Sequence, residues 1–81
     1  MTFKELKVGD TFDYEIDGSV YSFIKIDCLH IDILNSDHIY GDTSFVNSVC
    51  ISDEGCDKKY LGFLFLFESN KRIFHVNYER V

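Results

Sequence analysis

The sequence has no Trp, no Pro and only three Cys, and it contains no long apolar run. Its longest apolar stretch, YLGFLFLF at 60–67, is far shorter than the ~18 residues of a membrane span. An odd number of Cys argues against a closed disulfide framework, and free thiols are typical of the cytosol. Because residues 1–10 show no apolar signal-peptide core either, we expect a cytoplasmic protein that does not enter a membrane.

Basic residues are also scarce over most of the chain. Residues 9–57 hold 11 acids and a single base, Lys25, whereas residues 58–81 hold five bases and two acids. The net charge is −6. Nucleic-acid-binding proteins usually present a basic face, so we do not expect this protein to bind DNA or RNA directly.

Aromatic side chains, in contrast, are abundant, with 8 Phe and 5 Tyr in a chain that is 46% hydrophobic. A chain of this length is expected to form a single domain, residues 1–81. It buries only about 60% of its unfolded surface. Since aromatic side chains bury the most area per residue, they allow even so short a chain to build a core.

The first residues predict a short helical turn. Thr2 and Glu5 have the spacing of a capping box. Phe3 and Leu6 lie three residues apart, on one face of such a turn, and Gly9 is suited to end it. We therefore expect the two apolar side chains to close one end of the domain.

A β-hairpin follows the turn. Polar and apolar side chains alternate up to Asp17-Gly18, which is a strong two-residue turn signal. A two-residue loop places Phe12 opposite Phe23, whereas a three-residue loop places Phe12 opposite Ile24. The sequence leaves both registers open.

The rest of the chain predicts shorter strands, and together they define the fold class. Five to seven short antiparallel strands with one N-terminal helical turn predict an all-β domain, a small SH3-like barrel or a sandwich. The SH3-like barrel fits this chain length best. The predicted strands are 30–35, 38–46, 48–52, 60–67 and 72–81, with a bend near Asn47 and a loop at 52–59.

Two of these strands have a pattern that assigns their faces. In the strand at 60–67, side chains should alternate, with Leu61, Phe63, Phe65 and Phe67 on one face and Tyr60, Leu64 and Leu66 on the other. In the strand at 72–81, the same rule should turn Phe74, Val76 and Tyr78 inward and Ile73, His75 and Asn77 outward.

The opening pattern resembles that of small barrel proteins of tailed phages, which begin F-x-x-L-K-x-G-D-x-F and continue into a second strand. The resemblance covers about the first third of the chain. It implies an SH3-like fold and a phage or mobile-element origin, and it implies no activity. The matching residues are Phe3, Leu6, Lys7, Gly9, Asp10 and Phe12, followed by YSFIKI at 21–26.

Metal and catalytic motifs are not found. Cys28, His30 and Asp32 would share one face of a strand, but the paired ligand spacings of structural zinc sites are missing. SDEGCD at 52–57 lacks the residue order of a calcium loop, and there is no nucleophile elbow or phosphate-cradling loop. We expect no metal, no cofactor and no enzymatic activity. The remaining Cys and His, namely Cys50, Cys56, His38 and His75, are expected to be structural.

The segregated acids predict a docking surface. An array of negative charge would attract a basic surface and steer its association. The first hypothesis is therefore a small binding protein, a phage-borne inhibitor that docks on a basic host protein such as a nuclease, a defence protein or another nucleic-acid-binding protein. The candidate contact residues are Asp13, Glu15, Asp17, Asp27, Asp32, Asp37 and Asp42.

Self-association is the alternative. The predicted strand at 60–67 is apolar on both faces, and one strand cannot easily bury both faces in a single-layer barrel. The protein would then be a structural or assembly module that forms a homo-oligomer. Its candidate interface residues are Leu64, Leu66 and Ile73.

Overall fold

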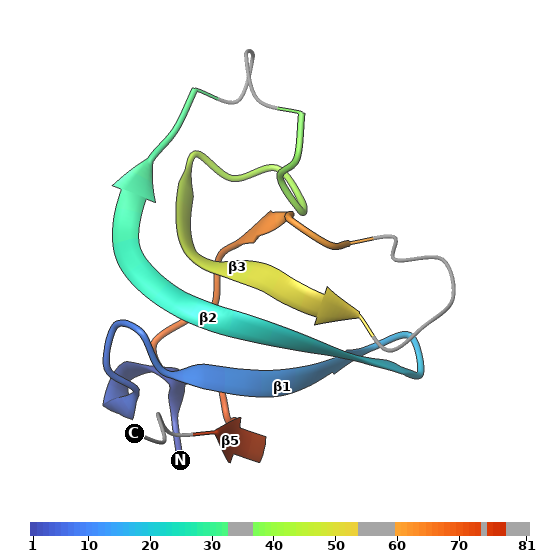
Figure 1. Ribbon diagram of the computed structural model, residues 1–81. Helices are drawn as coiled ribbons and strands as arrows, with labels where there is room; N and C mark the ends of the chain where they lie inside the picture. The colour runs from blue at the N-terminus through green and yellow to red at the C-terminus, as the bar shows by residue number, and fades with distance from the viewer. Residues whose placement is uncertain (33–36, 54–59, 74, 78–81) are drawn as a thin grey trace.

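The computed structural model describes residues 1–32, 37–53, 60–73 and 75–77, and in the ranges 52–53 and 75–77 the backbone alone. This part of the chain is mostly antiparallel sheet, with a single 3-10 turn at Phe3–Glu5 (Figure 1). The sheet is open and its strand order is β4-β3-β2-β1-β5. The predicted all-β class is confirmed. The strands are β1 (Thr11–Ile16), β2 (Ser19–His30), β3 (Phe45–Asp53), β4 (Leu64–Phe65) and β5 (His75–Asn77).

The β1–β2 hairpin takes the two-residue register. Asp17 and Gly18 have φ values of 50° and 84°. Positive φ at both central positions defines a type I′ turn, whose twist matches that of the flanking strands. Phe12 therefore lies opposite Phe23, and the alternative register, with Ile24 opposite Phe12, is wrong.

The core is built around a cluster of Phe rings from the N-terminal turn, β1, β2, β4 and the segment that follows β4. Phe12 of β1 stacks on Phe23 of β2 at 5.5 Å between ring centroids, and Phe23 meets Phe65 of β4 edge-on at 4.7 Å. Phe67 stacks on Phe3 of the N-terminal turn at 5.5 Å. The turn thus closes one end of the core, as predicted, and six of the ten residues of the described core cluster are aromatic.

Lys25 of β2 fixes the N-terminal turn to the sheet. Its ammonium group donates hydrogen bonds to the carbonyl oxygens of Phe3 and Leu6, at 3.0 and 2.7 Å. The same group lies 4.5 Å from the centroid of the Phe3 ring, within cation–π range. The only base of residues 9–57 therefore makes hydrogen bonds within the domain.

The middle strands differ from their prediction. β2 runs to His30, where a separate strand was expected at 30–35, and Ile31 and Asp32 continue without strand structure. No strand occupies 38–44, and β3 passes through Asn47 without the predicted bend. The pairing of β2 with β3 contains two register shifts, and this long-range pairing determines where both strands end.

The segment at 60–67 is a strand only at its centre, Leu64–Phe65. The predicted alternation holds there, because Phe65 and Phe67 are buried and Leu66 is exposed. It fails at the start, where Tyr60 packs against the core and Leu61 is exposed. The reason is a turn at residues 60–62, in which Gly62 has a φ of 85°.

The last described segment divides its pairing between two partners. Residues 71–73 first pair with the N-terminus: Phe3 N–H donates to the Lys71 carbonyl and Ile73 N–H donates to the Met1 carbonyl, both at 2.8 Å. The chain then reaches β1, which pairs with β5. Ile73 is 2% exposed, so the prediction that it faces outward is wrong, since strand alternation does not extend back to it. The faces predicted for residues 74–78 lie outside the described side chains.

Candidate functional site

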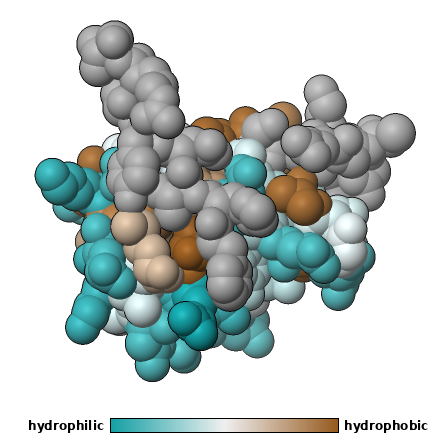
Figure 2. Space-filling view, turned by 90° about the horizontal axis from the view of Figure 1, so that it is seen from below, coloured by the Kyte–Doolittle hydropathy of each residue, from teal (hydrophilic) through white to brown (hydrophobic). Residues whose placement is uncertain are grey.

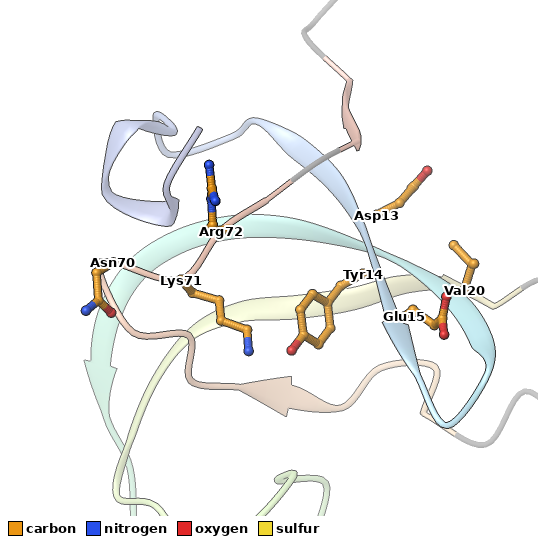
Figure 3. Close-up of a pocket in the computed structure, with 7 residues that line it drawn as sticks. All are labelled: Asp13, Tyr14, Glu15, Val20, Asn70, Lys71 and Arg72. Atoms are coloured by element: carbon orange, nitrogen blue, oxygen red, sulfur yellow. The ribbon is translucent and has the colours of Figure 1, made fainter.

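A groove opens beside β1 where the last segment leaves it. β5 pairs with β1 only over Thr11–Asp13, and the preceding residues pair with the N-terminus instead. The hollow between β1 and residues 70–72 has a volume of about 670 Å³, within the range of small-ligand sites. The residues that line this β1 groove are Asp13, Tyr14, Glu15, Val20, Asn70, Lys71 and Arg72 (Figure 3).

Tyr14 and Lys71 meet across the β1 groove. Figure 3 shows their side chains pointing toward one another, and the ammonium nitrogen lies 5.2 Å from the centroid of the Tyr14 ring. A hydrogen bond to the Tyr14 side chain raises the pKa of Lys71 above its usual value. The ring itself packs edge-on against Phe67 at 5.1 Å, so the core holds it in place.

A second hollow of about 500 Å³ adjoins the first. Both are lined by Tyr14, Glu15 and Lys71, so together they form one trough along the hairpin end of β1. The second hollow is more aromatic. Its other lining residues are Ile16, Asp17, Tyr40, Phe65, Leu66, Phe67 and Glu68.

The structure divides the predicted acidic contact residues into separate groups. Asp13, Glu15 and Asp17 lie together at the β1–β2 hairpin, and Glu15 and Asp17 are exposed. Asp13 is half-buried and accepts a hydrogen bond of 2.7 Å from the Ser22 hydroxyl. The others are exposed: Asp27 lies on β2, and Asp32, Asp37 and Asp42 follow that strand in the chain.

The candidate self-association residues also differ in their exposure. Leu66 is 44% exposed, Leu64 is half-buried, and Ile73 belongs to the core. Leu64 lies opposite Val49, which in turn lies opposite Ile24, so three half-buried apolar side chains form a row across the outer face of β2, β3 and β4. Figure 2, which views the molecule from below, shows mostly hydrophilic side chains with apolar ones exposed among them.

The Cys and His residues do not form a reactive cluster in the described part of the chain. Cys28 is exposed and Cys50 is buried. His30 packs against Phe45, with 5.0 Å between ring centroids, and His38 packs against Phe63. No three His, Cys, Asp or Glu side chains among the described residues lie close enough together to hold a metal ion. Cys56 and the side chain of His75 lie outside that part.

Among the described residues, no helix is long and apolar enough to cross a membrane. No family model matches the chain, and neither a curated protein nor a solved structure matches it.

Sequence reasoning did not find the β1 groove. The basic character of the last residues is visible in the sequence, but not that Lys71 and Arg72 line the same groove as Asp13 and Glu15. That juxtaposition depends on the divided pairing of residues 71–77, for which the sequence carries no local signal.

Proposed function

We propose that this protein is a small, non-enzymatic binding protein that docks through acidic side chains onto a basic protein. Of the candidate contacts, Glu15 and Asp17 at the hairpin and Asp27 on β2 are exposed. A basic partner would be attracted to them over about a Debye length, which is ~8 Å at physiological ionic strength.

The observation that carries this proposal is the position of Lys25. It is the only base among residues 9–57, and its ammonium group bonds to the main chain of Phe3 and Leu6. The ammonium group of Lys25 is therefore engaged by main-chain carbonyls of the N-terminal turn, while the chain carries a net charge of −6. Charge left uncompensated on a small domain favours association with a surface of the opposite sign.

We also propose that the curved sheet is an SH3-like barrel. One continuous stretch of chain supports this: β4 pairs with β3 at one edge of the sheet, and β5 pairs with β1 at the other. Between them, residues 69–73 bond to the N-terminal segment. A chain that joins both edges of a sheet covers them where it pairs, here Thr11–Asp13 of β1 and Ser48–Val49 of β3.

A phage origin and an inhibitory role are part of the same proposal. The resemblance of residues 3–12 to the opening of small phage barrel proteins supports the origin. A basic nucleic-acid-binding protein of the host cell, such as a nuclease or a defence protein, is the partner that fits an acidic surface, since such proteins present basic faces to phosphates.

Capture of a partner at two salt concentrations tests the proposal. The tagged protein is incubated with host-cell lysate at low and at high ionic strength, and bound proteins are identified by mass spectrometry. We expect a basic protein that is retained by the wild type at low salt and lost by a Glu15→Gln, Asp17→Asn, Asp27→Asn variant. The control, Glu15→Asp with Asp27→Glu, keeps the charges and should retain it. Equal capture by the neutral variant would contradict acidic docking.

Self-association is the second candidate, and the exposed Leu66 beside the apolar row of Ile24, Val49 and Leu64 favours it. Burial of these side chains between two copies would be driven by the hydrophobic effect. Sedimentation velocity distinguishes the two candidates. A dimer that persists at high salt and is lost in Leu66→Lys would support self-association, whereas a monomer at all concentrations would exclude it.

A further inference from the structure

We propose that the β1 groove binds an extended segment of the partner, which adds beside β1 at Glu15 and carries a basic residue between two apolar ones. This inference rests on the proposed function, because it specifies how the basic partner is held. It follows from three features of the groove: an open main-chain edge, a side-chain pattern with two different faces, and charge.

The open edge follows from the hairpin register. In a two-residue hairpin, the residues that flank the turn form a hydrogen-bonded pair, and such pairs alternate with non-hydrogen-bonded pairs. Ile16 lies opposite Ser19 beside the turn, so the next pair, Glu15 and Val20, is non-hydrogen-bonded. The N–H and C=O groups of Glu15 therefore point away from β2 and toward the groove.

On the groove side of β1, the strand pairing of the described residues ends short of Glu15. β5 pairs with β1 at Thr11–Asp13 and stops there, because residues 71–73 bond to Met1–Phe3. Among the residues that the structure describes, none pairs with the groove side of Glu15. An open strand edge is a template for another strand, and extended peptides use such edges through main-chain hydrogen bonds.

The side chains around Glu15 define what the incoming strand must carry. Its residue opposite Glu15 shares the face of that carboxylate and of Asp13. A Lys or Arg is favoured at this position, because opposite charges stabilise a cross-strand pair. The residues on either side of it face the other way, toward Tyr14 and Ile16 and the aromatic second hollow, where apolar side chains are favoured.

The position of Lys71 strengthens this specificity. Its ammonium group lies beside Tyr14 and lines both hollows. A basic side chain of the partner on this inner face would be repelled by Lys71, whereas on the outer face it meets Glu15. The groove therefore distinguishes an apolar–basic–apolar sequence from one in which the basic residues flank an apolar one.

Charge also argues against a second copy of the same chain in this groove. Two-fold pairing about the open edge would place Glu15 of one copy directly opposite Glu15 of the other. Like charges directly opposite one another destabilise a strand pair, and each copy carries a net charge of −6. A basic segment of another protein is thus the occupant that the site favours.

Peptide binding followed by NMR tests this inference. The ¹⁵N-labelled full-length protein is titrated at low salt with the capped pentapeptide Gly-Val-Lys-Val-Gly. We expect the amide signal of Glu15 to shift and its hydrogen exchange to slow. The same peptide with Glu in place of Lys should bind at least several-fold more weakly, and Glu15→Gln should weaken the Lys peptide roughly 1.5- to 5-fold, as expected for one cross-strand ion pair.

A modified peptide supplies the control that does not depend on folding of a variant. Methylation of the peptide nitrogen of Lys removes the N–H that would donate to the Glu15 carbonyl, and this should abolish binding. Equal binding of the methylated peptide would overturn strand addition, and so would no binding of the parent peptide. If shifts appear at Asp17 and Asp27 but not at Glu15, the strand-addition site is wrong while acidic docking stands.

Discussion

The carboxamide of Asn47 on β3 pairs with both main-chain groups of Phe67. Its nitrogen donates to the Phe67 carbonyl and its oxygen accepts from the Phe67 N–H, each at 2.9 Å. The side chain thereby extends the pairing of β3 with the chain beyond β4, and it fixes the residue whose ring packs edge-on against Phe12 and Phe23.

Loss of this pairing should destabilise the core. Asn47→Ala removes two partly buried hydrogen bonds at about 1 kcal/mol each, so the free energy of unfolding should fall by about 2 kcal/mol. Urea denaturation measures the change. Asn47→Asp places a carboxylate oxygen, which can only accept, against the Phe67 carbonyl oxygen, so it should destabilise the protein at least as much as Asn47→Ala. Unchanged stability in both variants would show that the pairing contributes nothing.

Loss of the hydrogen bonds of Lys25 should also lower the free energy of unfolding. Lys25→Met keeps an apolar stem but removes the bonds to Phe3 and Leu6, and hydrogen bonds to charged groups contribute ~1.5–3 kcal/mol. We expect a loss of about 2 kcal/mol by thermal or chemical unfolding. Lys4→Met, at an exposed site on the same turn, should change stability by less than about 0.5 kcal/mol. Equal effects of the two substitutions would contradict this role.

Ser48 is a site where substitution should stabilise the protein. It is fully buried on β3, and its hydroxyl has no hydrogen-bond partner among the described residues. An unsatisfied buried hydroxyl costs about 1–3 kcal/mol, so Ser48→Ala should raise the free energy of unfolding by about 1 kcal/mol. Cys50→Ser, on the same face of the same strand, should have the opposite effect. A destabilised Ser48→Ala would indicate a hydrogen bond from this hydroxyl.

Glu5 should make the N-terminal turn sensitive to acid. The Thr2 N–H and hydroxyl both donate to Glu5 Oε1, at 2.8 and 2.9 Å, and these bonds lower the pKa of Glu5. A lowered folded-state pKa contributes stability that is present above the unfolded pKa and lost as pH falls through the folded one. Wild type should therefore exceed Glu5→Gln in stability at neutral pH, and the difference should shrink below pH ~4. A difference that is independent of pH would contradict this assignment.

The sequence predicts the local features of this fold and misses the non-local ones. The hairpin turn, the N-terminal turn and the alternation of Phe65, Leu66 and Phe67 follow from neighbouring residues, and they are found. The ends of β2 and β3 depend on register shifts between distant strands, so they were misplaced. The burial of Ile73 follows from its bond to Met1 at the other end of the chain.

The candidate site shows the same division. The exposure of Glu15 and Asp17 follows from strand alternation and turn position, and it could be read from the sequence. The β1 groove could not be predicted from the sequence. It forms because residues 71–73 pair with the N-terminus and not with β1. The charge pattern also could not predict the hydrogen bonds of the Lys25 ammonium group, because they are made to main-chain carbonyls.

Acidic docking is tested most directly by the association rate constant of the captured partner at low and high ionic strength. Stopped-flow measurements would compare the wild type with the Glu15→Gln, Asp17→Asn, Asp27→Asn variant. We predict that the wild type associates several-fold faster at low salt and that the difference fades at high salt, because electrostatic steering is screened. Identical association rates at low ionic strength would contradict the account.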